Sequence, residues 1–240
     1  MSIVYRSDQY HTAASGLYPS VQSQFRAFNE PFEGAISHMY LDVLGLVTVG
    51  VGNLIDPVSV ATTLPFRFKN KPGIAMPGAL ASKEQIAAEW QKLKSNTSLA
   101  RKGHLACASI TDLELDHAGI DAVISERLAK NESYLKRQGP FKDFDTWPAD
   151  GQLALLSMAW AMGPAGALNF HHFCDSCAKL DFKAAATQCK MNEQGNPGLI
   201  PRNKANCTLL SNAAAVIAGE KTLGYQRATL YYPRALTLPN

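Results

Sequence analysis

Residues 32–54 read FEGAISHMYLDVLGLVTVGVGNL, and the interpretation of the whole chain depends on this stretch. The segment before it carries apolar residues at helical spacing, with Pro31 in its last turn. Proline removes a backbone hydrogen bond and glycine favours a helix C-terminus, so we expect the helix to end near Glu33-Gly34. A carboxylate therefore stands at a predicted helix end.

The second half of the same stretch predicts a β-hairpin. From Val47 to Gly52, valines alternate with small residues, a pattern typical of a half-buried strand whose other face is kept small. Residues 40–42 supply the preceding strand, and Gly45 supplies the turn. We expect Asp42 in the first strand or just after it, and Thr48 on the small face of the second strand.

Such a hairpin can hold one carboxylate across from another at a helix end, an arrangement suited to cleaving glycosidic bonds. A protonated carboxylic acid gives its proton to the leaving oxygen, and a carboxylate activates water or attacks the sugar carbon. Glu33 at a helix C-terminus is disfavoured as an anion, whereas Asp42 on a solvated hairpin tends to stay ionised. Thr48 offers a hydroxyl to position water, and Gly50 would let a polymer approach the backbone. The spacing of the carboxylates alone carries little weight, because such pairs arise by chance in most proteins.

The full pattern of this stretch is more specific than the carboxylate pair. It reads Glu33-Gly34, then Tyr40-x-Asp42-x-x-Gly45-x-x-Thr48-x-Gly50-x-Gly52-x-Leu54. This pattern resembles the catalytic signature of phage-type lysozymes, glycoside hydrolase family twenty-four. The resemblance implies that Glu33 is the general acid, that Asp42 aligns or activates the water, and that Thr48 supports that water. It also implies that Tyr40 and Gly50 contact the substrate.

Two later segments lie in the order expected for this family. Residues 147–163 resemble its buried central helix, and residues 201–204 resemble a later basic helix start. The resemblance implies that Trp160 lines a cleft floor, with packing in the core as the alternative. A looser alignment adds further cleft residues, for which a structural role is the alternative: Phe170, Gln188 and Arg202.

The resemblance implies an α+β, lysozyme-like fold that is mainly helical, with a small hairpin lobe, a helical lobe and a cleft between the two lobes. We expect an N-terminal extension over residues 1–20 and a single catalytic domain over residues 21–240. Its expected parts are the small lobe (21–56), an insertion or linker (57–110) and the helical lobe (111–240). Residues 56–78 predict a long loop, and helical patterns cover residues 83–94, 116–135, 150–162, 181–191 and 203–218.

Enzymes of this family cut the β-1,4 bond between N-acetylmuramic acid and N-acetylglucosamine in peptidoglycan, with inversion at the anomeric carbon. The resemblance thus implies a muramidase that needs no cofactor and whose macromolecular partner is peptidoglycan. The alternatives are a lytic transglycosylase on the same bond, a non-catalytic wall-binding domain, and a chitinase or chitosanase of the same general fold. A transglycosylase uses no water-activating aspartate, so the presence of Asp42 and Thr48 favours hydrolysis.

Composition narrows the class of protein without identifying it. The chain has 240 residues, 46% hydrophobic and 18% charged, with a formal net charge of +3, so it is too weakly basic for a dedicated nucleic-acid binder. No apolar segment is long enough to span a membrane, and residues 1–20 lack the apolar region of a signal peptide. We expect a monomer that acts in the periplasm or cell wall of target bacteria, delivered by phage lysis or a secretion machine. A periplasmic immunity or inhibitor protein, or the delivery apparatus, would then be a further partner.

Two weaker patterns leave alternatives open. The segment His171-His172-x-Cys174-x-x-Cys177 contains zinc-ligand types but lacks a second ligand pair at zinc-finger spacing, so we expect no metal. Disulfides among Cys174, Cys177, Cys189 and Cys207 or inert buried thiols are the other readings. Positive charge in the insertion forms either a solvated face or a surface that attracts anionic wall polymers. Its residues are Lys69, Lys71, Lys83, Lys92, Lys94, Arg101 and Lys102.

Overall fold

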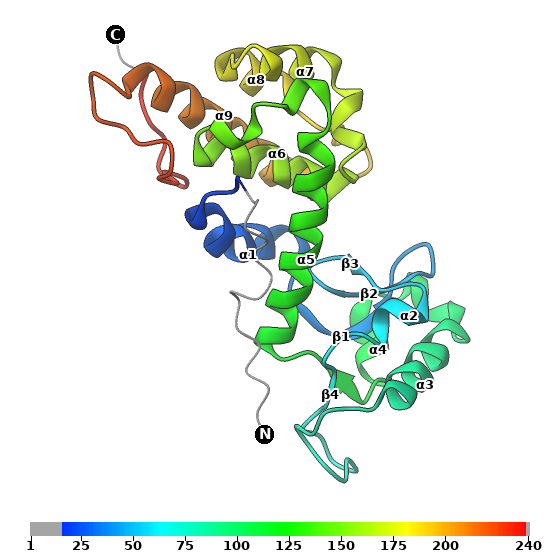
Figure 1. The fold of residues 1–240 in the computed structure, drawn as a ribbon. Helices are drawn as coiled ribbons and strands as arrows, with labels where there is room; N and C mark the ends of the chain where they lie inside the picture. Colours follow the sequence, from blue (N-terminus) through cyan, green and yellow to red (C-terminus); the bar gives the residue numbers. More distant parts are fainter. Residues whose placement is uncertain (1–15, 239–240) are drawn as a thin grey trace. The chain divides into compact units, whose positions relative to one another are not determined.

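The computed structural model describes residues 16–238, in which helices accompany two small antiparallel sheets (Figure 1). Among these residues the chain forms two compact units, Glu33–Arg127 and the combination of residues 16–32 with 128–238. The boundary falls inside two helices, α1 (Pro19–Glu33) and α5 (His117–Lys136), so each helix contributes to both units. This mixture of helix and antiparallel sheet is the expected α+β class. Most of the predicted extension over residues 1–20 lies outside the described residues.

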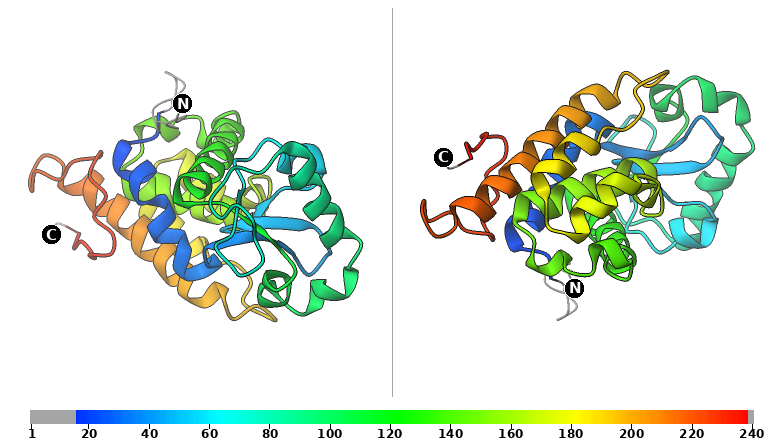
Figure 2. Two further views of the ribbon diagram at one scale, coloured as in Figure 1. Left: turned by 90° about the horizontal axis from the view of Figure 1, so that it is seen from below. Right: turned by 90° about the horizontal axis from the view of Figure 1, so that it is seen from above.

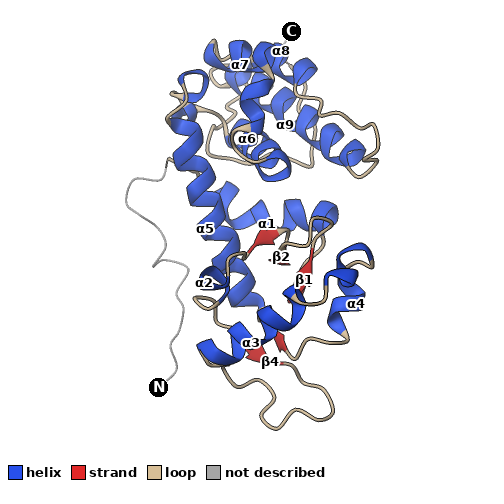
Figure 3. Ribbon diagram, turned by 90° about the vertical axis from the view of Figure 1, so that its right-hand side faces the viewer, coloured by secondary structure: helices blue, strands red, loops and turns tan. Residues whose placement is uncertain are grey.

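The main sheet of the first unit is the predicted hairpin with a third strand added (Figure 3). β1 (Ile36–Leu41), β2 (Val47–Gly50) and β3 (Asn53–Leu54) pair in that order, and both pairings are antiparallel. Tyr40 of β1 lies directly opposite Thr48 of β2. These two residues, which the sequence places in different strands, are therefore cross-strand neighbours on one face of the sheet.

The expectation that β2 is half-buried is wrong. All residues from Val47 to Gly50 are buried, and even Thr48 is only 5% exposed. At Gly50 the small face is covered by α5, since a Cβ on this glycine would lie 3.9 Å from Ile120 Cγ2. The small residues of β2 make room for a helix, so β2 is the buried centre of its sheet.

The predicted insertion over residues 57–110 is folded, and the expectation of a long loop over residues 56–78 is correct only in part. Its elements are α2 (Val58–Ala61), β4 (Arg67–Phe68), α3 (Lys83–Lys94), the 3-10 helix η2 (Thr97–Arg101) and α4 (His104–Ala108). β4 pairs with β5 (Leu113–Glu114), which follows the insertion. This second sheet joins the beginning of the insertion to the residues just after it, and α5 follows directly.

α3 begins with a reciprocal capping box between Ser82 and Gln85. Ser82 Oγ accepts a hydrogen bond from the Gln85 backbone amide at 3.3 Å, and Gln85 Oε1 accepts one from the Ser82 amide at 2.8 Å. This reciprocal capping box satisfies two amides that the first turn of a helix leaves without partners.

The second unit is built around α6 (Ala149–Met162), the predicted buried central helix. Residues 149–160 of α6 are all buried, and α6 packs against α9 (Leu199–Gly219), which is orange in Figure 2. α9 begins earlier than predicted because Pro201 falls in its first turn, where a missing amide is tolerated. The other elements are α7 (His171–Ala178), α8 (Phe182–Gln188) and the 3-10 helices η3 (Gly139–Phe141), η4 (Phe144–Thr146) and η5 (Gly166–Asn169).

A buried carboxylate on α6 holds the C-terminal segment of this unit. Asp150 accepts hydrogen bonds from the backbone amides of Tyr231 at 2.8 Å and Tyr232 at 3.0 Å, and from Asn212 Nδ2 at 2.8 Å. Burial raises the pKa of Asp150, although these donors act in the opposite direction. These contacts hold the irregular segment that follows α9 against α6 and α9.

Candidate functional site

Glu33, the predicted acid, is the last residue of α1 and lies beside the end of the hairpin sheet. Pro31 lies inside α1, and Gly34 follows at a φ of +71°, a left-handed conformation that glycine adopts readily. A Cβ placed on Gly52 would lie 3.3 Å from Glu33 Oε2, so the carboxylate lies directly against the turn between β2 and β3. The predicted helix end is confirmed.

Asp42, the second predicted carboxylate, organises the turn between β1 and β2. Its Oδ1 atom accepts hydrogen bonds from the backbone amides of Leu44 and Leu46, both at 2.8 Å. Its own amide donates to the Leu46 carbonyl at 2.9 Å. Within residues 16–238, Oδ2 has no hydrogen-bond partner. One oxygen of this carboxylate therefore holds the turn, and the other can accept a hydrogen bond from water or a ligand.

Tyr40 joins the two carboxylates in one electrostatic environment. Burial, followed by the negative charges of Glu33 and Asp42, raises the pKa of Tyr40 to about 12. The positive charge of Arg127 acts on the same hydroxyl in the opposite direction. Glu33, Asp42 and Arg127 therefore all influence the titration of one phenol in the first unit.

Thr48 and Gly50 are both enclosed by the protein. The Thr48 hydroxyl donates to the Leu46 carbonyl at 3.3 Å, so what it can offer a water molecule is a lone pair rather than its proton. A Cβ on Gly50 would lie 3.2 Å from Asn53 Oδ1. The space left by this glycine, expected to admit a polymer, is occupied by a buried side chain of the same unit.

Two residues that sequence reasoning missed complete this cluster. Arg127 Nη1 donates to the Gly52 carbonyl at 2.6 Å, and Asn53 Nδ2 donates to the Val123 carbonyl at 3.3 Å. Asn53 Oδ1 is buried and has no hydrogen-bond partner within the described chain. Asn53 stands inside the signature stretch and could have been noticed there. Nothing in the sequence distinguishes Arg127 from the other charged residues of α5.

The insertion supports the hairpin through two side chains of α3. The sequence predicted this helix but not these contacts. Trp90 Nε1 donates to the Ile55 carbonyl at 3.1 Å, just beyond β3. Lys94 Nζ donates to the Gly45 carbonyl at 2.9 Å, in the turn that follows Asp42. Because the Ile55 amide donates to the Val47 carbonyl at 2.9 Å, both contacts lie at the end of the sheet where the turn after Asp42 is found.

Two predicted substrate-binding residues belong to the second unit. Trp160 is 3% exposed, and its ring packs edge-to-face on Phe25 with 4.8 Å between centroids. Gln188 accepts a hydrogen bond from Ser176 Oγ at 2.9 Å. The looser candidate Arg202 is 1% exposed and donates to Asn29 Oδ1 at 2.8 Å, which supports the structural alternative for this residue.

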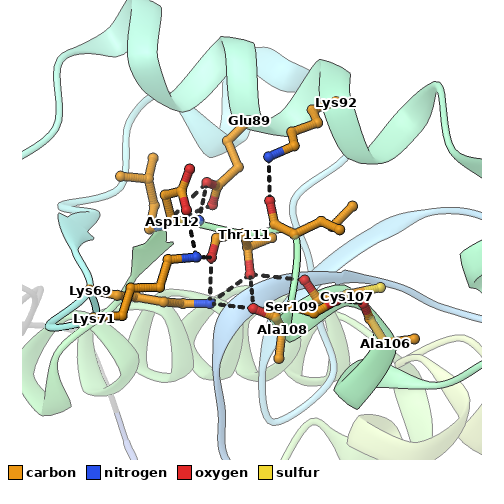
Figure 4. A network of polar contacts seen from close by, with 12 residues as sticks. Lys69, Lys71, Glu89, Lys92, Ala106, Cys107, Ala108, Ser109, Thr111 and Asp112 are labelled. Carbon is orange, nitrogen blue, oxygen red and sulfur yellow. Dashed lines mark hydrogen bonds and ion pairs between the residues drawn. The ribbon is translucent and has the colours of Figure 1, made fainter. Parts of the chain in front are cut away.

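Several basic residues of the insertion are used inside the first unit (Figure 4). Lys69 Nζ donates to the carbonyls of Ala108 and Thr111, and Lys71 pairs with Asp112 at 2.6 Å. Lys92 Nζ donates to the Ile110 carbonyl at 2.5 Å. These three lysines bind at or just after the end of α4. Lys83, Lys92, Arg101 and Lys102 are exposed, which is compatible with either a solvated face or an anion-attracting surface.

The cysteines are free thiols in the structure. Cys107, Cys174, Cys177 and Cys189 are buried, and Cys207 is exposed. Burial raises the pKa of Cys177 and Cys189, which makes both poor nucleophiles. Of the readings left open by the sequence, the structure has free thiols rather than disulfides, buried except at Cys207.

No group of three or more His, Cys, Asp or Glu side chains in residues 16–238 is arranged to hold a metal ion. In the same part of the chain, no helix combines the length and the apolar character needed to cross a membrane.

Comparison with known proteins does not assign the chain to a family. No protein-family model matches the sequence, and no curated protein matches it. The chemistry of the site must therefore be argued from its residues and their geometry.

Proposed function

We propose that the protein is a peptidoglycan hydrolase, a muramidase that cleaves the β-1,4 bond between N-acetylmuramic acid and N-acetylglucosamine. One observation carries the proposal: Glu33 Oε2 lies against Gly52 in the turn after β2, and Asp42 organises the turn before β2. The two carboxylates singled out by the sequence signature thus flank the strand that carries Thr48, in a single folded unit. A pair of carboxylates with different surroundings is what acid-assisted glycoside hydrolysis needs.

The surroundings of each carboxylate support its proposed role. Glu33, the last residue of α1, gives its proton to the leaving oxygen from a position against Gly52, in the turn between β2 and β3. Asp42 is held by two backbone amides on Oδ1, which leaves Oδ2 to align the attacking water. Thr48, opposite Tyr40, supports that water through a lone pair.

The proposal extends to the fold and the place of action. The proposed fold is lysozyme-like, with the hairpin sheet in its small lobe and α6 in its helical lobe. Peptidoglycan lies outside the cytoplasmic membrane, so the protein would act in the periplasm or cell wall after phage lysis or injection by a secretion machine. A cognate inhibitor in the periplasm would protect a producing cell.

The decisive experiment is mass analysis of purified cell walls digested by the protein. We expect muropeptides with a hydrated reducing end, and loss of most of this activity in both Glu33→Gln and Asp42→Asn. Products lighter by one water would identify a lytic transglycosylase instead. Binding to walls without any cleavage would identify a non-catalytic domain, and full activity in Glu33→Gln would refute the proposed acid.

A further inference from the structure

One face of α5 contacts the turn between β2 and β3 at successive positions. Ile120 Cγ2 lies 3.9 Å from the position of a Cβ on Gly50, and the Val123 carbonyl accepts from Asn53 Nδ2 at 3.3 Å. One further turn along, Arg127 Nη1 donates to the Gly52 carbonyl at 2.6 Å. Residues spaced in this way share one side of a helix, so α5 lies along the whole turn.

Gly52 connects this helix face to the proposed acid. It has a φ of +79°, which glycine adopts without strain, and a Cβ there would lie 3.3 Å from Glu33 Oε2. The Glu33 carboxylate therefore lies against the α-carbon of the residue whose carbonyl Arg127 binds. Any movement of this turn changes the room available to the acid.

The charge of Arg127 also reaches the site. Its guanidinium acts on the Tyr40 hydroxyl together with Glu33 and Asp42. Arg127 is only partly buried, on the side of α5 that faces the turn.

We propose that Arg127 is a positioning residue, which fixes the Gly52 turn so that the Glu33 carboxyl is held in its working position. This inference rests on the proposed function for its effect on turnover. The planar guanidinium directs its donors rigidly, so it fixes the Gly52 carbonyl more closely than an ammonium on a flexible stem would. Misplacing a catalytic group by about 1 Å can cost on the order of 100-fold in rate.

The chain contains a matched control for this contact. Arg67 Nη1 donates to the Gly78 carbonyl at 3.0 Å, and Arg67 Nε pairs with Asp116 at 2.9 Å. Arg67→Gln removes an arginine from the first unit and breaks an arginine–glycine carbonyl contact that lies outside the candidate cluster.

The first test is steady-state kinetics on soluble peptidoglycan fragments of defined length. We expect Arg127→Gln to lower kcat by at least about tenfold with little change in KM, because a positioning residue acts on turnover. Arg127→Lys should recover part of the loss, and Arg67→Gln should behave as wild type. An unchanged kcat in Arg127→Gln would overturn the inference, as would an equal loss in Arg67→Gln or a rise in KM alone.

The second test does not depend on activity. In protein labelled with ¹⁵N-glycine, Arg127→Gln should shift the amide signals of Gly52 and Gly34, the residue after Glu33, and leave Gly78 in place. Arg67→Gln should shift the amide signal of Gly78 and leave those of Gly52 and Gly34 in place. Unshifted Gly52 and Gly34 signals in Arg127→Gln would refute the positioning role. If the wild-type protein cleaves no peptidoglycan while the two variants show the expected shifts, the proposed function is refuted and the contact between Arg127 and Gly52 stands. Arg127→Lys, which keeps the charge, serves both tests if the glutamine variant fails to fold.

Discussion

Lys94 of α3 forms an ion pair with Asp56, with 2.8 Å between Nζ and Oδ2. Asp56 Oδ2 also accepts from the Val47 amide at 3.3 Å, at the start of the strand that carries Thr48. Together with the bond from Lys94 to the Gly45 carbonyl, this contact ties the insertion to the turn that Asp42 organises. The insertion is thus a support for the hairpin rather than a separate addition.

Removing this support should destabilise the hairpin. We expect Lys94→Met to lower the free energy of unfolding by about 1–2 kcal/mol, since the pair is partly buried and the ammonium also binds a carbonyl. Urea denaturation measures the change. Lys83→Met, at an exposed position in the first turn of the same helix, should have little effect. Equal stability of the two variants would contradict the supporting role of Lys94.

The two functions assigned to Asp42 can be separated by substitution. Asp42→Asn keeps an oxygen that can accept from the Leu44 and Leu46 amides, so the fold should persist while hydrolytic activity is lost. Asp42→Ala removes the acceptor as well and should cost a further about 1–3 kcal/mol of stability. Wall-clearing assays and urea denaturation on both variants measure the two effects. Wild-type activity in Asp42→Asn would exclude a role for the charge.

The stability of the protein should fall in mild acid through His38. Burial lowers the pKa of His38 from its ordinary value of 6.5; Lys69 and His104 act in the same direction, against Glu114 and the bond to the His104 carbonyl. The folded protein therefore prefers the neutral ring, and the stability from this group is complete above about 6.5 and is lost as the pH falls below that value.

Urea denaturation between about pH 7.5 and about pH 5.5 tests this dependence. The free energy of unfolding should fall less steeply toward acid in His38→Gln, whose amide can still donate to the His104 carbonyl. Identical slopes in the variant and the wild type would remove His38 as the cause.

Thiol reactivity should distinguish one cysteine from the rest. Cys207 is exposed, whereas the other four cysteines are buried. Burial raises the pKa of Cys177 and of Cys189. An aromatic disulfide reagent should therefore modify Cys207 rapidly in the native protein, and Cys207→Ser should abolish this rapid phase. In denaturant all 5 cysteines should react. A lower count would reveal a disulfide and contradict the free thiols of the structure.

Sequence reasoning succeeds here wherever the deciding interaction is local. Pro31 and Gly34 place the end of α1, and Ser82 with Gln85 places the start of α3, because each signal acts within a single helical turn. The buried helix α6 follows from a continuous apolar run in the same way. The burial of β2 does not, because alternating residues cannot reveal that a distant helix covers the small face.

The amino-acid sequence by itself determined which residues the proposed chemistry uses: two carboxylates and a threonine, on a helix end and a hairpin whose geometry depends on near neighbours. Only the tertiary structure decided what holds them in place. Arg127 reaches Gly52 across 75 positions and Lys94 reaches Gly45 across 49, and no periodicity or spacing records such contacts. The reason is physical: a long side chain can satisfy a carbonyl anywhere within its reach, and folding alone determines which carbonyl that is.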